Sequence, residues 1–183
     1  MIRLLDIFFS LLGLILLSPI LTIIFIFGLF DTGSPLFRQE RIGRNEKPFI
    51  LVKFRTMTRN SISVATHLAD ANNVTSYGHF LRKTKLDELP QLWNVLKGEM
   101  SLVGPRPGLI NQFELINARR RYDVFVARPG ITGMAQINGI DMSTPELLAQ
   151  TDARMLASLT PISYLKYITI TVLGRGQGDA IIR

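Results

Sequence analysis

The chain has 183 residues, of which 47% are hydrophobic, and a formal net charge of +7. This length accommodates one domain with a substantial core, and the charge favours an anionic partner such as a membrane surface, a phosphate ligand or nucleic acid. The absence of cysteine excludes disulfides, thiolate catalysis and cysteine-zinc sites, and two histidines are too few for a histidine-rich metal site.

The first predicted element is an uncharged apolar segment, residues 7–30. As one straight helix it would reach about 36 Å, enough to cross a hydrocarbon core of about 30 Å. It is too long for the apolar region of a signal peptide, and no small-residue cleavage site follows it. The pattern therefore predicts a retained membrane segment.

Ser18 and Pro19 lie at the centre of this segment. Proline removes a backbone hydrogen bond, and a neighbouring serine can satisfy the freed carbonyl. Each half is about 16 Å long, so a sharp bend would return the chain to the side from which it entered. Hydropathy alone favours the other geometry, a kinked spanning helix. In both cases the basic residues at 38, 41, 44 and 47 place the downstream side in the cytoplasm.

The remainder reads as one globular unit without repeats. Two short strands, residues 35–41 and 47–54, are expected to form a hairpin across Gly43-Arg44-Asn45. Residues 59–77 are polar and aperiodic, which indicates a mobile loop. Helices are predicted over residues 90–97, 109–121, 145–158 and 161–173. The last helix is apolar on most sides, so it suits either a membrane interface or the core.

Two adjacent acids, Asp87 and Glu88, precede Pro90. Acidic residues favour helix starts, so in isolation they read as part of a helix cap. Adjacent helix positions are about 100° apart, so the two carboxylates would not share a face as an acid/base pair. A chemical role would need divided labour, in which one carboxylate reacts and the other steers a metal ion or a proton.

Basic residues near the acids favour the chemical reading. Lys53 and Arg55 end an apolar strand and point to one face, and an arginine stands between two prolines at Pro105-Arg106-Pro107. Three more cations, Arg82, Lys83 and Lys85, lie just before the acids. Together these groups fit a diphosphate site, because arginine binds phosphate bidentately and Mg²⁺ needs only one or two carboxylates beside substrate phosphates.

Four motifs occur in order along the chain: KFRTM at 53–57, LDELPQ at 86–91, SLVGPRP at 101–107 and RPGITG at 128–133. With them, the chain resembles the bacterial sugar transferase family, the small single-domain monotopic polyprenyl-phosphate phosphoglycosyl transferases. The resemblance covers essentially the whole chain. It implies a mainly α fold with a small β-hairpin, a re-entrant helix-break-helix over residues 1–30 with Ser18 and Pro19 at the break, and interfacial amphipathic helices. Residues 31–183 would form the cytoplasmic catalytic domain.

The resemblance also implies a reaction. A phospho-sugar would pass from a UDP-sugar to undecaprenyl phosphate with release of UMP, by a ping-pong mechanism that uses Mg²⁺. The reaction would start glycoconjugate assembly at the cytoplasmic face of the bacterial inner membrane. Asp87 matches the nucleophile and a metal ligand of the family, and Glu88 matches its partner. The phosphate-binding positions match Lys53, Arg82 and Arg106. A homodimer is one of the assemblies left open.

The chain departs from the common family pattern at three positions. Met134 stands where many members have tryptophan, Ile140 where arginine often occurs, and Tyr167 near the place of an aspartate. These changes leave the acidic pair intact and leave the identity of the sugar open.

Two other classes of function would account for the basic charge. A nucleic-acid binder would explain the charge, but no recognisable binding motif accompanies it, so no nucleic-acid partner is expected. A non-enzymatic scaffold that binds anionic lipid through its basic surface is the alternative to the transferase.

Overall fold

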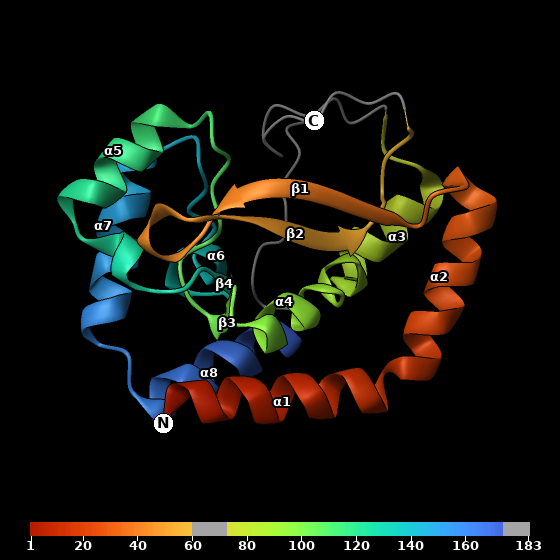
Figure 1. Cartoon of the computed structure of the whole chain (residues 1–183), viewed down its shortest axis with the longest axis horizontal. Helices are drawn as coiled ribbons and strands as arrows, with labels where there is room; N and C mark the ends of the chain where they lie inside the picture. Colours follow the sequence, from red (N-terminus) through yellow and green to blue (C-terminus); the bar gives the residue numbers. More distant parts are fainter. Residues whose placement is uncertain (60–72, 174–183) are drawn as a thin grey trace.

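The computed structural model describes residues 1–59 and 73–173, which are mainly helical with a small antiparallel hairpin (Figure 1). The helices are α1 (Ile2–Leu16), α2 (Ser18–Thr32), α3 (Ser76–Thr84), α4 (Gln91–Lys97), α5 (Phe113–Arg121), α6 (Met134–Ile137), α7 (Pro145–Ala157) and α8 (Pro161–Val172). The strands are β1 (Leu36–Ile42), β2 (Pro48–Phe54), β3 (Ser101–Val103) and β4 (Gly130–Thr132). Single 3-10 turns lie at η1 (Arg44–Glu46), η4 (Leu86–Glu88) and η5 (Val124–Val126).

The apolar N-terminal segment is a pair of helices, α1 and α2, bent by 64° at Leu17. Pro19 lies in the first turn of α2, and the Ser18 hydroxyl donates to the carbonyl of Ile15 at 2.8 Å. That carbonyl is four residues before Pro19, so the serine replaces the bond that proline cannot make. Within the described residues no single helix has the length and apolarity to cross a bilayer, whereas the bent pair meets both criteria together.

The predicted hairpin is confirmed. β1 is shifted by one residue from the expected bounds, and β2 begins one residue later than expected and ends at the expected residue. The strands pair antiparallel and place Phe37 opposite Lys53. At the tip, Asn45 and Glu46 adopt positive φ angles of 54° and 59°. Asparagine tolerates this left-handed region better than most residues, which explains the sharp reversal.

The sequence pattern misses or misplaces several elements. The parallel pair β3–β4 escapes prediction because each strand has three residues, too few to show an alternation. α5 begins at Phe113 instead of residue 109, since Leu109 and Gln112 close a turn through their backbone and the Gln112 side chain. α3 begins at Ser76, inside the expected loop, where the Thr75 hydroxyl caps it. The mobility expected for residues 60–72 lies outside the described residues.

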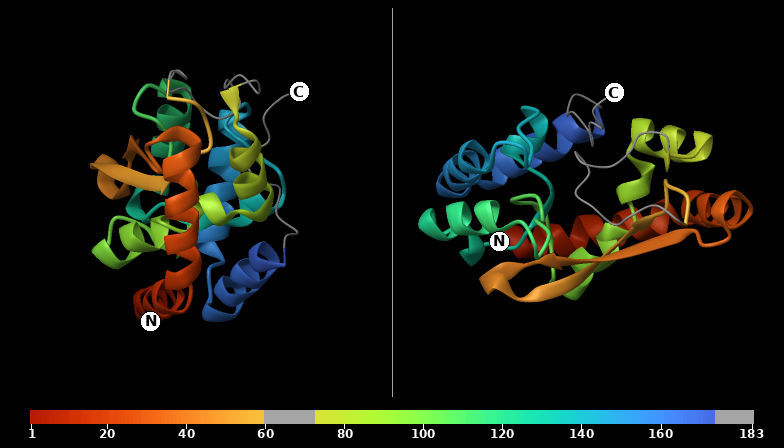
Figure 2. Two further views of the ribbon diagram at one scale, coloured as in Figure 1. Left: turned by 90° about the vertical axis from the view of Figure 1, so that its right-hand side faces the viewer. Right: turned by 90° about the horizontal axis from the view of Figure 1, so that it is seen from above.

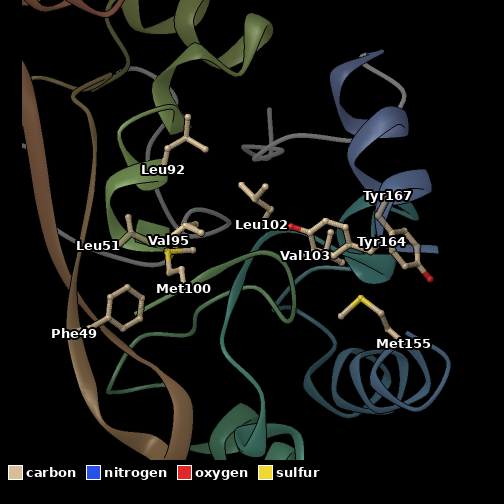
Figure 3. Packing of buried hydrophobic residues seen from close by; sticks show 10 residues of the cluster. All are labelled: Phe49, Leu51, Leu92, Val95, Met100, Leu102, Val103, Met155, Tyr164 and Tyr167. Atoms are coloured by element: carbon tan, nitrogen blue, oxygen red, sulfur yellow. The ribbon is translucent and has the colours of Figure 1, made fainter. Parts of the chain in front are cut away.

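The main core joins the hairpin to the C-terminal helices. Seen from above, the hairpin lies on one side and α7 and α8 lie on the other, with the β3–β4 pair between them (Figure 2). Figure 3 shows the side chains that fill the space: Phe49, Leu51, Leu92, Val95, Met100, Leu102, Val103, Met155, Tyr164 and Tyr167. α8 is therefore a core helix along its tyrosine face, while Ile162, Leu165 and Val172 on the same helix are exposed.

A buried carboxylate connects α1 to this core. Asp6 is 2% exposed, and its Oδ1 atom accepts hydrogen bonds from the Ser101 hydroxyl at 2.8 Å, the Leu102 amide at 2.9 Å and the Tyr164 hydroxyl at 2.8 Å. The Arg3 guanidinium lies 3.9 Å from its other oxygen and donates to the Val95 and Leu96 carbonyls of α4. Burial, followed by the bond to Asp6, raises the pKa of Tyr164 far above its usual range. The tyrosine is therefore a neutral donor.

We expect Asp6→Ala to lower the free energy of unfolding by about 3 kcal/mol or more, because three buried donors lose their acceptor at about 1–3 kcal/mol each. Denaturant unfolding of the purified chain measures the change. Asp31→Ala is the matched control, since Asp31 is an exposed acid of α2 that accepts one bond from Thr75. The control should stay within about 0.5 kcal/mol of the unsubstituted chain. Equal losses in the two variants would contradict this role of Asp6.

Candidate functional site

The acidic pair lies on its own helical turn, η4, between α3 and α4. Lys85 precedes the turn with a left-handed backbone (φ 57°), which ends α3 and redirects the chain. Asp87 is 4% exposed and Glu88 is half-buried. Pro90 occupies the N-cap position of α4 and makes no side-chain cap bond there. Neither acid therefore occupies the N-cap of α4, and the capping interpretation loses its main support.

Glu88 opens onto a small surface cleft. The cleft is lined by Arg41, Leu51, Lys53, Glu88, Gln91, Arg106, Pro107, Gly130 and Ile131. The Arg106 guanidinium lies 3.6 Å from the Glu88 carboxylate, with both side chains about one quarter exposed (26% and 21%). Cations predominate over the single carboxylate in this lining, so the cleft is suited to an anionic ligand.

Lys53 reaches the cleft from β2, on the same side of the strand as Leu51. Its ammonium lies 5.7 Å above the ring of Phe37, its neighbour across the hairpin. The strand is held against α4 by the fully buried Asn94, which accepts from the Val52 amide and donates to the Ile50 carbonyl. Because Asn94 ties β2 to α4, it helps to fix the position of Lys53 relative to the acidic pair that precedes α4.

Arg82 lies on α3, and its Nε atom donates to the Thr56 hydroxyl at 2.9 Å, just beyond the end of β2. Arg55 turns to the backbone instead, donating to the carbonyls of Ser34 and Leu36, and burial lowers its pKa, assisted by the charge of Arg59. Of the predicted site residues, the structure brings Lys53, Glu88 and Arg106 into one cleft. Asp87 and Arg82 are not among the lining residues within the described part of the chain.

Sequence reasoning missed Arg41 and Gln91, which also line the cleft. Arg41 was counted only among the basic residues that follow the membrane segment, but it is 7% exposed and donates to Pro107 and Gln39. Its position two residues after Gln39 on one strand face was the available signal. Gln91 stands inside the LDELPQ motif, which draws attention to it only once the acids are taken as chemical.

The loop that carries Arg106 starts where β3 and β4 approach most closely. A Cβ atom on Gly130 would lie 2.0 Å from the Gly104 amide nitrogen, and one on Gly104 would lie 2.4 Å from the Arg128 carbonyl oxygen. These distances are too short for any side chain. Arg128, for its part, donates to the Gly98 carbonyl at the end of α4. The RPG motif thus joins the Arg106 loop to the helix that follows the acids.

A metal ion would have few protein ligands here. Among residues 1–59 and 73–173, no group of three or more histidine, aspartate or glutamate side chains could hold one. Mg²⁺ is commonly held by one or two carboxylates together with substrate phosphates, and Glu88 of the acidic pair supplies a carboxylate at the cleft.

Comparison with known proteins gives consistent matches. The family model described as bacterial sugar transferase matches residues 1–175. The UDP-glucose:undecaprenyl-phosphate glucose-1-phosphate transferase of Klebsiella pneumoniae is 46% identical over 75% of this chain and 30% of its own length. The undecaprenyl-phosphate galactose phosphotransferase of Salmonella typhimurium is 39% identical over 75% of this chain and 32% of its own length. The uncharacterized sugar transferase EpsL of Bacillus subtilis is 44% identical over 76% of this chain and 69% of its own length. The chain therefore spans about a third of the two longer relatives.

Gly130→Ala should displace β4 from β3 and disturb the cleft. We expect the free energy of unfolding to fall by about 3 kcal/mol, because the added methyl group would meet backbone atoms, which cannot move aside as a flexible side chain could. For a chain of this size that corresponds to a fall of about 6–12 °C in the unfolding midpoint. Gly108→Ala is the control, since its Cβ would meet only side-chain atoms at 3.3 Å. A smaller loss at Gly130 than at Gly108 would contradict the close approach.

Proposed function

Because the chain belongs to the bacterial sugar transferase family, we propose that it transfers a phospho-sugar from a UDP-sugar to undecaprenyl phosphate and releases UMP. The observation that carries the proposal is the cleft, which Lys53 lines and in which Glu88 and Arg106 lie 3.6 Å apart. Glu88 directly follows Asp87 in the chain. A diphosphate is the ligand chemistry that this arrangement suits, since guanidinium and ammonium groups bind phosphate oxygens. The names of the Klebsiella and Salmonella relatives describe the same class of reaction.

The reaction follows a ping-pong course in this proposal. A carboxylate oxygen of Asp87 attacks the β-phosphorus of the UDP-sugar, and the bond to the bridging oxygen breaks so that UMP leaves with the electron pair. A phosphate oxygen of undecaprenyl phosphate then attacks the same phosphorus and releases the Asp87 carboxylate. The product is an undecaprenyl diphosphate sugar. Lys53, Arg82 and Arg106 would stabilise the phosphate charge in both steps.

Mg²⁺ would be held by Asp87 and the substrate phosphates, where it would neutralise charge on the diphosphate. Glu88 is assigned to steering the metal or a proton. The Arg106 guanidinium, 3.6 Å from the Glu88 carboxylate, would help to orient it.

A membrane location accompanies this function. The acceptor is a lipid, and large exposed apolar side chains are concentrated on the bent helix pair and α8: Leu4, Phe8, Leu11, Ile15, Leu16, Ile23, Phe27, Phe30, Ile162 and Val172. We propose that α1 and α2 form a re-entrant element in the cytoplasmic leaflet of the inner membrane, with α8 in its interface. The 64° bend and the Ser18–Ile15 bond support this geometry over a straight span.

Relatives are named for glucose, galactose and N-acetylgalactosamine transfer. The transfer would start assembly of an O-antigen, a capsule, an exopolysaccharide or a glycoprotein glycan. Met134, Ile140 and Tyr167 depart from the family pattern, but none of them lines the described cleft, and Tyr167 packs in the core.

The two-step reaction predicts a burst. With a UDP-sugar alone, the purified protein should release about one UMP per active site before any polyprenyl phosphate is added. Asp87→Asn should abolish the burst, since an amide is a poor nucleophile and a weak Mg²⁺ ligand. Glu88→Gln should slow both half-reactions, and chelation of divalent cations should suppress the burst until Mg²⁺ is restored. Release is followed with UDP-glucose, UDP-galactose and UDP-N-acetylgalactosamine.

Asp31→Asn, an exposed acid of α2, is the control and should burst like the unsubstituted protein. A phospho-sugar adduct mapped by mass spectrometry to a residue other than Asp87 would remove it from the centre of the mechanism. A chain that binds anionic vesicles but releases no UMP from any of these donors would favour the scaffold alternative.

The membrane geometry has its own test. The chain has no cysteine, so Ile2→Cys introduces a unique thiol near the start of α1. In the re-entrant arrangement this thiol should resist a membrane-impermeant reagent in intact cells and react after permeabilisation. Pro19→Ala should partly straighten the pair and increase labelling from outside. Labelling of position 2 in intact cells without the proline substitution would indicate a spanning helix.

A further inference from the structure

Each backbone carbonyl of the segment from Pro105 to Gly108 is bound by a different part of the protein. The Pro105 oxygen accepts from the Gly130 amide at 2.8 Å, and the Gly108 oxygen accepts from the Ile42 amide at 3.0 Å. Arginine side chains bind the two carbonyls between them. Arg119 Nη1 donates to the Arg106 oxygen at 2.8 Å, and Arg41 Nη1 donates to the Pro107 oxygen at 3.1 Å.

Arg119 is itself held by a buried carboxylate. Its Nε and Nη2 atoms donate to Asp152 Oδ2 on α7 at 3.1 and 2.7 Å, so all three nitrogens of the guanidinium are used. The two side chains are 3% and 0% exposed. Burial raises the pKa of Asp152, and the charge of Arg119 opposes that shift.

Stability is a poor reason for this pair. Desolvation of two charges consumes most of their attraction, and apolar residues of similar volume often replace such pairs without loss. A planar guanidinium is, however, well suited to hold a carboxylate and a carbonyl at fixed relative positions. The carbonyl in question belongs to the residue whose own side chain lies beside Glu88.

We propose that Arg119, oriented by Asp152, is a positioning residue that fixes the backbone of Arg106 and so holds its guanidinium at the cleft. This inference rests on the proposed function, because it assigns Arg106 to the substrate diphosphate. Arg119 acts through its hydrogen bond to the Arg106 carbonyl. Its neighbour Arg120 on the same helix pairs instead with Glu46 on the surface.

The first variant is Arg119→Lys, which keeps the positive charge against Asp152 but cannot donate to both oxygens as the guanidinium does. We expect kcat/KM for the UDP-sugar that gives the burst to fall about tenfold to a hundredfold, since small displacements of a binding group have effects of this size. Arg120→Lys is the matched control, because it alters an exposed ion pair of α5, and should leave kcat/KM unchanged.

A second variant separates an effect on activity from an effect on folding. Arg119→Met combined with Asp152→Leu removes both charges together, which preserves packing better than leaving one of them buried alone. It should keep the unfolding midpoint near that of the unsubstituted chain and show the same fall in kcat/KM. A merely structural pair predicts normal kinetics in this variant once it is folded.

A double-mutant cycle with Arg106→Ala separates positioning from other roles. If Arg119 acts through Arg106, Arg119→Lys should lower kcat/KM in the parent protein and have no further effect in the Arg106→Ala background. Hydrogen exchange of the peptide spanning residues 101–112 should rise in Arg119→Lys and stay unchanged in Arg120→Lys.

Additive losses in the cycle, unchanged exchange, or normal kcat/KM in both Arg119 variants would overturn the positioning role while the transferase activity stands. An unsubstituted chain that releases no UMP from any tested UDP-sugar would overturn the proposed function and this inference together.

Discussion

One carboxylate oxygen joins the N-terminal helix pair to the rest of the molecule. Asp6 Oδ1 accepts bonds from both residues that begin β3 and from Tyr164 of α8. β3 continues within two residues into the loop that carries Arg106, so α1, α8 and the cleft share a rigid connection. In the membrane arrangement proposed above, this connection would fix the height of the cleft relative to the apolar helices.

The Arg106 loop is also held by hydrogen bonds from distant parts of the chain. Prolines on either side stiffen the segment, but its position is set by carbonyl bonds to β1, β4 and α5, which come from distant parts of the chain. Asp6 and the Arg119–Asp152 pair are both buried ionisable groups; Asp6 accepts bonds from three donors, and the pair bonds to the Arg106 carbonyl. Because buried charge is expensive to leave unpaired, each such group permits only a narrow range of backbone positions. The charged residues of this protein thus fix backbone positions in the interior and suit the cleft to an anionic ligand.

Much of the architecture could be predicted from local pattern. The bend needed only Ser18 and Pro19, since the loss of one hydrogen bond and its replacement by a hydroxyl are local events. The hairpin followed from alternation and a turn. β3 and β4 gave no signal because three-residue strands carry no periodicity, and their closeness depends on glycines 26 residues apart in the sequence that meet only after folding. α5 began later than expected because the Gln112 side chain competes for a backbone amide.

In the candidate site, too, some features follow from local sequence and others only from the tertiary structure. By itself the sequence determined the acidic pair, Lys53 and Arg106, because charged residues beside proline and strand ends stand out in a linear chain, and four ordered motifs marked the family. Only the tertiary structure decided that Lys53, Glu88 and Arg106 share a cleft, that Arg41 lines it, and that Arg119 turns inward while Arg120 faces solvent. In the sequence Arg119, Arg120 and Arg121 are equivalent cations at a helix end. Their difference depends on Asp152, which lies on α7, 33 residues after Arg119 in the sequence. No local pattern encodes which of three adjacent side chains will face a buried carboxylate.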